Sequence, residues 1–354
     1  MIAAVYHGPE DLRVEQFPTP SARGGEVVLR VDHASICATD LRILKGAHRK
    51  YGPGTVRVPG HEVVGTIVEL GRGVNRYQLG QRVFVAPNVG CGRCPQCQRG
   101  QNNLCVNYDA LGITLDGAFA EFMRIPAPFL EQENLIPFDE KLEGAAVALA
   151  EPFACVLHGQ HALHLSSNDI VLILGAGPIG IMHLLAARAA GVKKILVSEQ
   201  SPERLRIAAN MGADRVINFR EESLPDLVSA ETGDRGADAI VVAAGVREAM
   251  ETAPVLAGIG GRINFFAGLP SGDTNVVLDA NLIHYKELIV TGTTGCSTAD
   301  CRLSMDLISS GKVDLAPLVS RRYDLEHVTD AFSAVRAGNV LKVVLQQIQA
   351  RSEL

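Results

Sequence analysis

The sequence lacks the features that mark several large classes of protein. No run of basic residues stands out and the formal net charge is −6, so a nucleic acid is not an expected partner. The residues after Met1 lack the basic and apolar regions of a signal peptide, and they are predicted to form a first strand. The chain also has no internal repeat and no low-complexity segment. We therefore expect a globular protein of the cytoplasm, a reducing compartment that keeps its eight cysteines reduced.

One apolar run, from Ile170 to Ala187, is long enough to raise the question of a membrane span. The run is interrupted by Gly175–Pro178 and contains His183, which would be costly in lipid. These residues favour a buried strand, a tight turn and a buried helix. No association with a membrane is expected.

Four of the cysteines fall in one short window, with the spacing C-x2-C-x2-C-x7-C from Cys91 through Cys94 and Cys97 to Cys105. Closely spaced thiolates on a tight loop suit a tetrahedral Zn²⁺ ion, and four of them close its coordination sphere. One alternative is a pair of disulfides, which a reducing compartment disfavours. The other is an iron–sulfur cluster, but in the bacterial ferredoxin motif the spacing between the third and fourth cysteines is shorter and a proline follows the fourth. The spacing therefore predicts a structural zinc that holds a loop and takes no part in chemistry.

The 354 residues are enough for two domains, and the residue pattern changes near position 153. Residues 1–150 contain β-branched runs punctuated by glycine and proline, which predicts a β-rich domain. Beyond that point short apolar strands alternate with helical stretches, which predicts a parallel, doubly wound sheet. The expected strands of the first region are 26–31, 63–69 and 82–85, and those of the second are 170–174, 194–198, 239–243, 262–267 and 288–291, with helices at 179–190 and 202–211.

The last part of the chain returns to a different pattern, with a predicted helix near Val328–Arg336 and a strand-like Lys342–Leu345. We therefore expect residues 1–153 and 299–354 to form one domain. Residues 154–298 are expected to form the dinucleotide-binding domain between them.

A glycine-rich motif, Gly175-Ala-Gly177-Pro178-Ile179-Gly180, follows an apolar strand and opens a helix. Gly175 permits a tight turn, Gly177 lets the backbone approach a pyrophosphate, and Gly180 allows close packing of helix on strand. The helix N-terminus supplies N–H groups and a positive dipole for the phosphates. The motif and its context predict a dinucleotide site that includes Pro178 and Ile179.

The acid that follows this motif bears on the choice of dinucleotide. Glu199 ends the next predicted strand, where a carboxylate accepts hydrogen bonds from the adenosine ribose of NAD and repels the phosphate of NADP. The alternative interpretation is that Glu199 is a surface acid at the end of a strand, without a role in binding. Arg204 lies one helical turn further on, where it is expected to face solvent or to pair with an acid, although it could also meet a phosphate. We therefore predict NAD as the cofactor.

A second group of metal-ligand residues is dispersed along the chain. Cys37 and His61 lie in the β-rich domain with Glu62, and Glu151 lies at the domain junction. Taken singly, a buried cysteine is usually a small hydrophobe and a lone histidine is usually packed in the core. Together they offer the three protein ligands that a catalytic zinc needs, with either glutamate as the third.

The order of these motifs resembles that of the zinc-dependent medium-chain alcohol dehydrogenase superfamily, and the resemblance covers nearly the whole chain. It implies a GroES-like β-rich catalytic domain joined to a Rossmann domain, and one catalytic and one structural zinc per chain. The motifs are Cys37-x-Thr39-Asp40, Gly60-His61-Glu62-x-x-Gly65, the four-cysteine window and Gly175-x-Gly177-x-x-Gly180.

Glu151-Pro152 stands where classical alcohol dehydrogenases carry a second cysteine ligand, and in this the chain is similar to the sorbitol (polyol) dehydrogenase branch. That branch implies Glu62 as a direct ligand and Glu151 as a residue that acts through zinc-bound water. Two places depart from the pattern. Leu41-Arg42 occupies the usual place of a proton-relay histidine, and Gly295-Cys296 that of an Arg-Tyr pair.

The resemblance implies an NAD-dependent oxidoreductase that acts on a secondary alcohol, such as a polyol or a sugar-derived alcohol. Zinc would act as a Lewis acid, and Thr39 would take the hydroxyl proton and pass it on. The enzyme is expected to be a homo-oligomer, a tetramer rather than a dimer, paired through the strand near Leu288–Thr294. The alternatives are a dehydrogenase of an amino or hydroxy acid such as threonine, a zinc-free relative, and a nucleotide-sensing protein without turnover.

Overall fold

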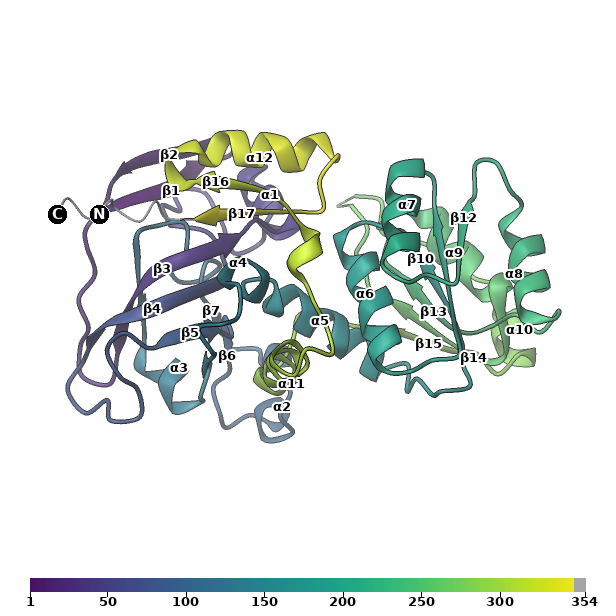
Figure 1. The fold of residues 1–354 in the computed structure, drawn as a ribbon, viewed down its shortest axis with the longest axis horizontal. Helices are drawn as coiled ribbons and strands as arrows, with labels where there is room; N and C mark the ends of the chain where they lie inside the picture. Colours follow the sequence, from purple (N-terminus) through teal and green to yellow (C-terminus); the bar gives the residue numbers. More distant parts are fainter. Residues whose placement is uncertain (271, 347–354) are drawn as a thin grey trace. The chain divides into compact units, whose positions relative to one another are not determined.

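The computed structural model describes residues 1–270 and 272–346, and the chain divides into two compact units (Figure 1). One unit contains Met1–Ala154 and the chain from Cys296 on, and the other contains Cys155–Gly295. Among the described residues, no helix has the length and apolar character that crossing a membrane requires.

The first unit is built on a seven-stranded sheet. On its central strand, β3 (Val27–Ser35), Val27, Leu29 and Val31 are buried in the core of this unit. The two strands nearest the C-terminus join this sheet, because β17 pairs with β3 through Val344 and Ser35. The sheet strands are β3 (Val27–Ser35), β4 (Glu62–Leu70), β5 (Arg82–Val85), β8 (Phe122–Ile125), β9 (Leu135–Pro137), β16 (Val319–Asp324) and β17 (Lys342–Gln346).

Smaller elements surround this sheet. An antiparallel hairpin begins the chain, and α12 contacts β16 and β17 while it buries Val328 and Phe332 in the core (Figure 1). These elements are β1 (Ile2–Gly8), β2 (Asp11–Gln16), β6 (Asn88–Val89), β7 (Asp109–Ala110), α1 (Ala38–Leu44), α2 (Pro95–Gln98), α3 (Ala127–Glu131), α4 (Gly144–Val147), α11 (Thr298–Ser309) and α12 (Val328–Ala337). Helix α5 (Ala150–His161) runs from the first unit into the second.

The second unit is a six-stranded parallel sheet in the order β12-β11-β10-β13-β14-β15. Every residue of β10 is buried, as expected for a strand covered on both faces. The strands are β10 (Ile170–Leu174), β11 (Lys194–Glu199), β12 (Arg215–Asn218), β13 (Ala237–Val242), β14 (Ala257–Phe265) and β15 (Ile289–Gly292). The helices are α6 (Pro178–Ala189), α7 (Pro202–Asn210), α8 (Leu224–Thr232), α9 (Arg247–Leu256) and α10 (Ala280–Tyr285).

The predicted fold class and the longer predicted strands and helices are confirmed. Strand β12 was missed because Arg215 and Asn218 give it no apolar run. Strand β14 begins at Ala257, earlier than predicted, because Gly258, Gly260 and Gly261 dilute its apolar pattern.

Candidate metal centres and dinucleotide site

The sulfur atoms of Cys91, Cys94, Cys97 and Cys105 lie within 4.8 Å of one another, and no disulfide joins them. Backbone N–H groups from Arg93 and Cys94 lower the pKa of the Cys91 thiol to about 6, whereas burial raises that of Cys97 to about 12. Four thiols at this spacing cannot all ionise at neutral pH without a cation between them. The donor set fits a tetrahedral zinc ion.

The cysteine loop is tied to the body of the first unit. A Cβ at Gly90 would overlap the Sγ of Cys97, so glycine is required there. Gln132 Nε2 donates to the carbonyl oxygen of Gly90 at 2.8 Å, and Asn102 Nδ2 donates to that of Asn88 at 3.0 Å. A metal in this loop would therefore stabilise the segments that it joins.

The ligand atoms of Cys37, His61 and Glu62 also lie within 4.8 Å of one another. Strand pairing brings them together, because Ser35 near the end of β3 pairs with Glu62 at the start of β4. Cys37 then follows β3 as the N-cap of α1, and His61 immediately precedes β4. Thr39 lies half-buried in the first turn of α1.

Asp40 is the acidic neighbour of this group, and the sequence motif assigns it no role. Its Oδ2 accepts the backbone N–H of Cys37 at 2.9 Å, and its Oδ1 lies 3.6 Å from His61 Nδ1. Burial lowers the pKa of His61, but the charges of Asp40 and Cys37 outweigh it and raise that pKa well above its usual value. The surroundings of His61 therefore favour a positive charge, which suits a metal cation.

Lys342 is a second residue that sequence reasoning missed. Its Nζ donates to both carboxylate oxygens of Glu62, at 2.8 and 2.6 Å, and to the carbonyl oxygen of Ile36 at 3.1 Å. Burial lowers the pKa of Lys342, but Glu62 and Cys37 more than compensate and raise it, which favours the ammonium form of the lysine. The only available signal was a lysine at the start of an otherwise apolar strand.

Glu151 lies buried in the first turn of α5, outside the group formed by Cys37, His61 and Glu62. Its Oε1 is 3.9 Å from the Sγ of Cys296. Its charge still contributes to the raised pKa of Lys342, so it lies close to the Glu62 ion pair. The structure thus brings three of the four proposed catalytic ligands into one cluster. The fourth, Glu151, lies in a separate group with Cys155 and Cys296.

The glycine motif of the second unit forms the turn between β10 and α6. Gly175 has φ +106°, and a Cβ at Gly180 would overlap the carbonyl oxygen of Gly175, so both positions require glycine. A Cβ at Gly177 would meet nothing within 4 Å, so the backbone is open on that side. Pro178 begins α6 and Ile179 follows it, which leaves the helix N-terminus facing the loop.

Glu199 ends β11 and is buried beside this turn. Its Oε2 accepts the N–H of Ala176 at 3.0 Å, and its Oε1 accepts those of Gln200 and Ser201 at 2.8 and 3.2 Å. Arg204 Nη1 lies 3.8 Å from Oε2. The carboxylate therefore helps to fix the glycine turn.

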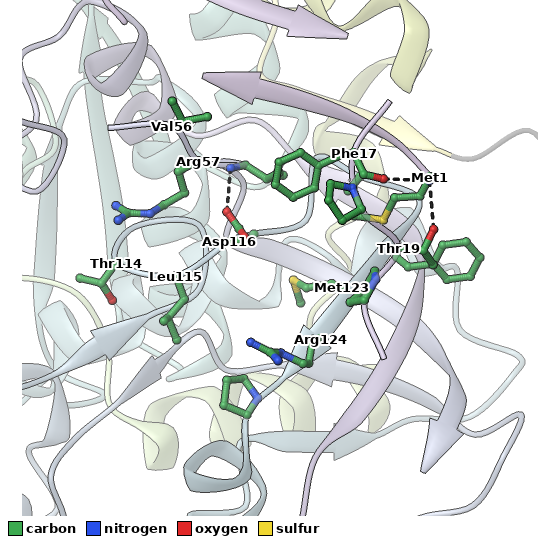
Figure 2. A pocket seen from close by; sticks show the side chains of 17 residues that line it. Met1, Phe17, Thr19, Val56, Arg57, Thr114, Leu115, Asp116, Met123 and Arg124 are labelled. Atoms are coloured by element: carbon green, nitrogen blue, oxygen red, sulfur yellow. Dashed lines mark hydrogen bonds between the residues drawn. The ribbon is translucent and has the colours of Figure 1, made fainter. Parts of the chain in front are cut away.

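A surface hollow of about 490 Å³ in the first unit contains none of the predicted site residues (Figure 2). Its polar groups already have partners: the α-amino group of Met1 donates to Phe17 O and Thr19 Oγ1, each at 3.0 Å, and Asp116 accepts from the N–H of Val58. We assign it no chemistry.

Two known families match this chain, one in each part. Residues 23–134 match the alcohol dehydrogenase GroES-like domain, and residues 178–310 match the zinc-binding dehydrogenase family. An L-threonine 3-dehydrogenase of Rhizobium johnstonii is 32% identical and covers 98% of this chain, as this chain covers 98% of it. The chain belongs to the zinc-dependent medium-chain alcohol dehydrogenase superfamily. It is therefore an oxidoreductase, a dehydrogenase of small molecules.

Other members of the superfamily differ in their named substrates and cofactors. The sorbitol dehydrogenase of Bacillus subtilis is 33% identical over 94% of this chain and 92% of its own. A zinc-binding dehydrogenase from Sinorhizobium meliloti bound to NADP has a TM-score of 0.89 at 30% identity, covering 98% of each chain. An Escherichia coli alcohol dehydrogenase complexed with NADH has a TM-score of 0.86 at 30% identity, covering 98% of this chain and 99% of its own.

Proposed function

We propose that this protein is an NAD-dependent zinc dehydrogenase that oxidises a secondary alcohol, either a polyol or a sugar-derived alcohol. The observation that carries the proposal is the cluster of Cys37, His61 and Glu62, of which His61 and Glu62 are buried. Its thiol and imidazole, with a carboxylate from Glu62 or Glu151, fit a catalytic zinc. L-Threonine is the second candidate substrate, because the threonine dehydrogenase relative matches the chain over nearly its whole length. The hydroxyl group of threonine is also a secondary alcohol.

In this proposal Cys37 and His61 hold the catalytic zinc, and Glu62 or Glu151 completes the site. Lys342 neutralises Glu62, which weakens that carboxylate as a donor, so we favour Glu151 as the carboxylate that faces the metal directly or through water. Asp40 positions both Cys37 and His61. Bound zinc would supply Lewis acidity at the substrate oxygen.

Thr39 is the proposed first acceptor of the substrate's hydroxyl proton. It lies two residues after Cys37 on the first turn of α1. The pKa of a hydroxyl is far from neutral, so Thr39 relays a proton and does not retain it. A ribose hydroxyl or a water must receive the proton next.

The loop of Cys91, Cys94, Cys97 and Cys105 is the proposed structural zinc site, which gives two zinc ions per chain. Reduced thiolates of this kind persist in a reducing compartment, and we propose the cytoplasm.

The second unit is the proposed NAD-binding domain, and the first is the proposed catalytic domain. The open backbone at Gly177 and the N-terminus of α6 would receive the pyrophosphate, and Glu199 would face the adenosine ribose. A carboxylate there disfavours the additional phosphate of NADP.

We propose a homo-oligomer, with a tetramer favoured over a dimer. Strand β15 ends the sheet of the second unit and exposes 52% of Ile289. Ile259 on the neighbouring β14 is 85% exposed. An unprotected apolar sheet edge invites pairing with another chain, and a second copy would cover it.

A panel of alcohols tests the proposed function. Purified protein is assayed with NAD and polyols, sugar alcohols, simple secondary alcohols and L-threonine. The proposal expects the highest kcat/KM on a polyol or sugar-derived alcohol. Highest turnover on L-threonine would replace it with the second candidate, and no turnover on any secondary alcohol would refute both.

A further inference from the structure

Cys296 lies on a well-fixed turn at the start of α11. The residue before it, Gly295, has φ +62°, and the residue after it, Ser297, is the N-cap of the helix. Ser297 and Asp300 form a buried capping box, in which Asp300 Oδ2 accepts the N–H of Ser297 at 2.9 Å and Ser297 Oγ accepts that of Asp300 at 3.2 Å. The capping box holds the backbone that directly follows Cys296.

The thiol of Cys296 contacts Glu151 at two points. Its Sγ lies 3.9 Å from Glu151 Oε1 and 4.0 Å from the carbonyl oxygen of Glu151. It also lies 3.6 Å from the Sγ of Cys301. Cys296 and Cys301 are each 1% exposed and Glu151 is 6% exposed, so water is excluded from these contacts. A hydrogen bond from a weak donor such as a thiol is stronger in such surroundings than in water.

We propose that Cys296 is a positioning residue for Glu151, whose carboxylate it orients toward the catalytic metal by donating its S–H to Oε1. This inference rests on the proposed function, because it needs the metal that Cys37 and His61 would hold. The carboxylate of Glu151 can rotate about its side-chain bonds, and a donor fixed on the capped start of α11 limits that rotation. Lys342 restrains the other carboxylate, that of Glu62, in a comparable way.

Cys301 provides the matched control. It is the same residue type, it is equally buried, and its sulfur contacts that of Cys296. The proposal assigns the hydrogen bond to Cys296, so truncation of Cys301 removes a buried thiol without removing that donor.

The test measures zinc affinity and a Co²⁺ spectrum in the full-length chain. Chelator competition measures the affinity for the zinc ion of the proposed catalytic site, which is the zinc ion that Cys37→Ser should lose. Co²⁺ bound in the same site is followed by its d–d absorption bands. Cys296→Ala is expected to weaken the affinity by roughly tenfold and to shift the bands. Cys301→Ala is expected to change neither. Cys296→Ser keeps a donor on the same Cβ and is expected to bind zinc more tightly than Cys296→Ala.

The inference is overturned if Cys296→Ala leaves both the affinity and the bands unchanged, or if Cys301→Ala changes them equally. Loss of a thiolate-to-cobalt charge-transfer band in Cys296→Ser would also overturn it, by making Cys296 a ligand. If Cys296→Ala does not fold, the same comparison is made between Cys296→Val and Cys301→Val, which fill the space of the thiol without a donor. Failure of the proposed function would appear separately, as wild-type protein without the second zinc or without turnover of alcohols.

Discussion

Lys342 and Glu62, 280 residues apart in the chain, form a buried ion pair in which one ammonium group bonds both carboxylate oxygens. The exposed fractions of the two side chains are 6% and 0%. This pair ties β17 to the start of β4, beside the proposed catalytic metal. Removal of either partner would leave the other charge buried without compensation.

Removal of the lysine alone should therefore be costly. Lys342→Met leaves Glu62 as an uncompensated buried charge, and we expect a loss of about 3–5 kcal/mol in the free energy of unfolding. Chemical denaturation of the zinc-loaded protein measures this loss. The double variant Lys342→Met with Glu62→Gln should recover part of it, and Lys312→Met, at an exposed lysine, should be neutral. A loss below about 1 kcal/mol in Lys342→Met would show that the pair carries little energy.

Stability should fall as the pH falls from neutral, because of His183. Burial lowers the pKa of this histidine to about 3, so it stays neutral in the folded state while the unfolded chain takes up a proton near pH 6.5. The unfolded state then binds more protons, and the contribution of His183 falls by about 1.4 kcal/mol per pH unit between these values. When the free energy of unfolding is measured from pH 7 to pH 5, it should fall less steeply with pH in His183→Leu than in the wild type. Parallel curves for the wild type and the variant would contradict this.

NAD should be preferred over NADP by at least about tenfold in kcat/KM, because Glu199 would face the NADP phosphate across a few ångströms. Glu199→Ser should reduce that preference, mainly by weakening NAD and partly by admitting NADP. Glu203→Ser, at an exposed acid on α7, is the control and should leave the ratio unchanged. Wild-type protein that uses both cofactors equally well would show that Glu199 does not select between them.

The cysteine loop should depend on its metal for order. Cys97→Ser opens a closed four-thiolate site, and structural zinc in small sites is worth about 10–16 kcal/mol of binding free energy. We expect a loss of several kcal/mol in stability, together with proteolytic cleavage between residues 91 and 105. Limited proteolysis with mass spectrometry measures the second effect. An uncleaved loop in metal-free Cys97→Ser would show that the loop holds its shape without zinc.

The parts of the site that local spacing alone could predict are those whose residues are close together in the chain. The four cysteines from Cys91 to Cys105 lie on one loop, and the Gly175–Gly180 motif forms one turn. Cys37, His61 and Glu62 are dispersed, and it was the family resemblance that singled them out as a group. Lys342 could not be predicted, because it meets Glu62 only after β17 joins the sheet through β3. Cys296 could not be predicted for the same reason, since the fold brings it against Glu151 from 145 residues away.

Metal analysis of purified wild-type protein and of Cys37→Ser distinguishes a structural zinc from a catalytic one. We expect two zinc ions per wild-type chain and one in Cys37→Ser, which should keep its fold and lose turnover of its best alcohol. One zinc per wild-type chain, or near-normal turnover in Cys37→Ser, would contradict this expectation.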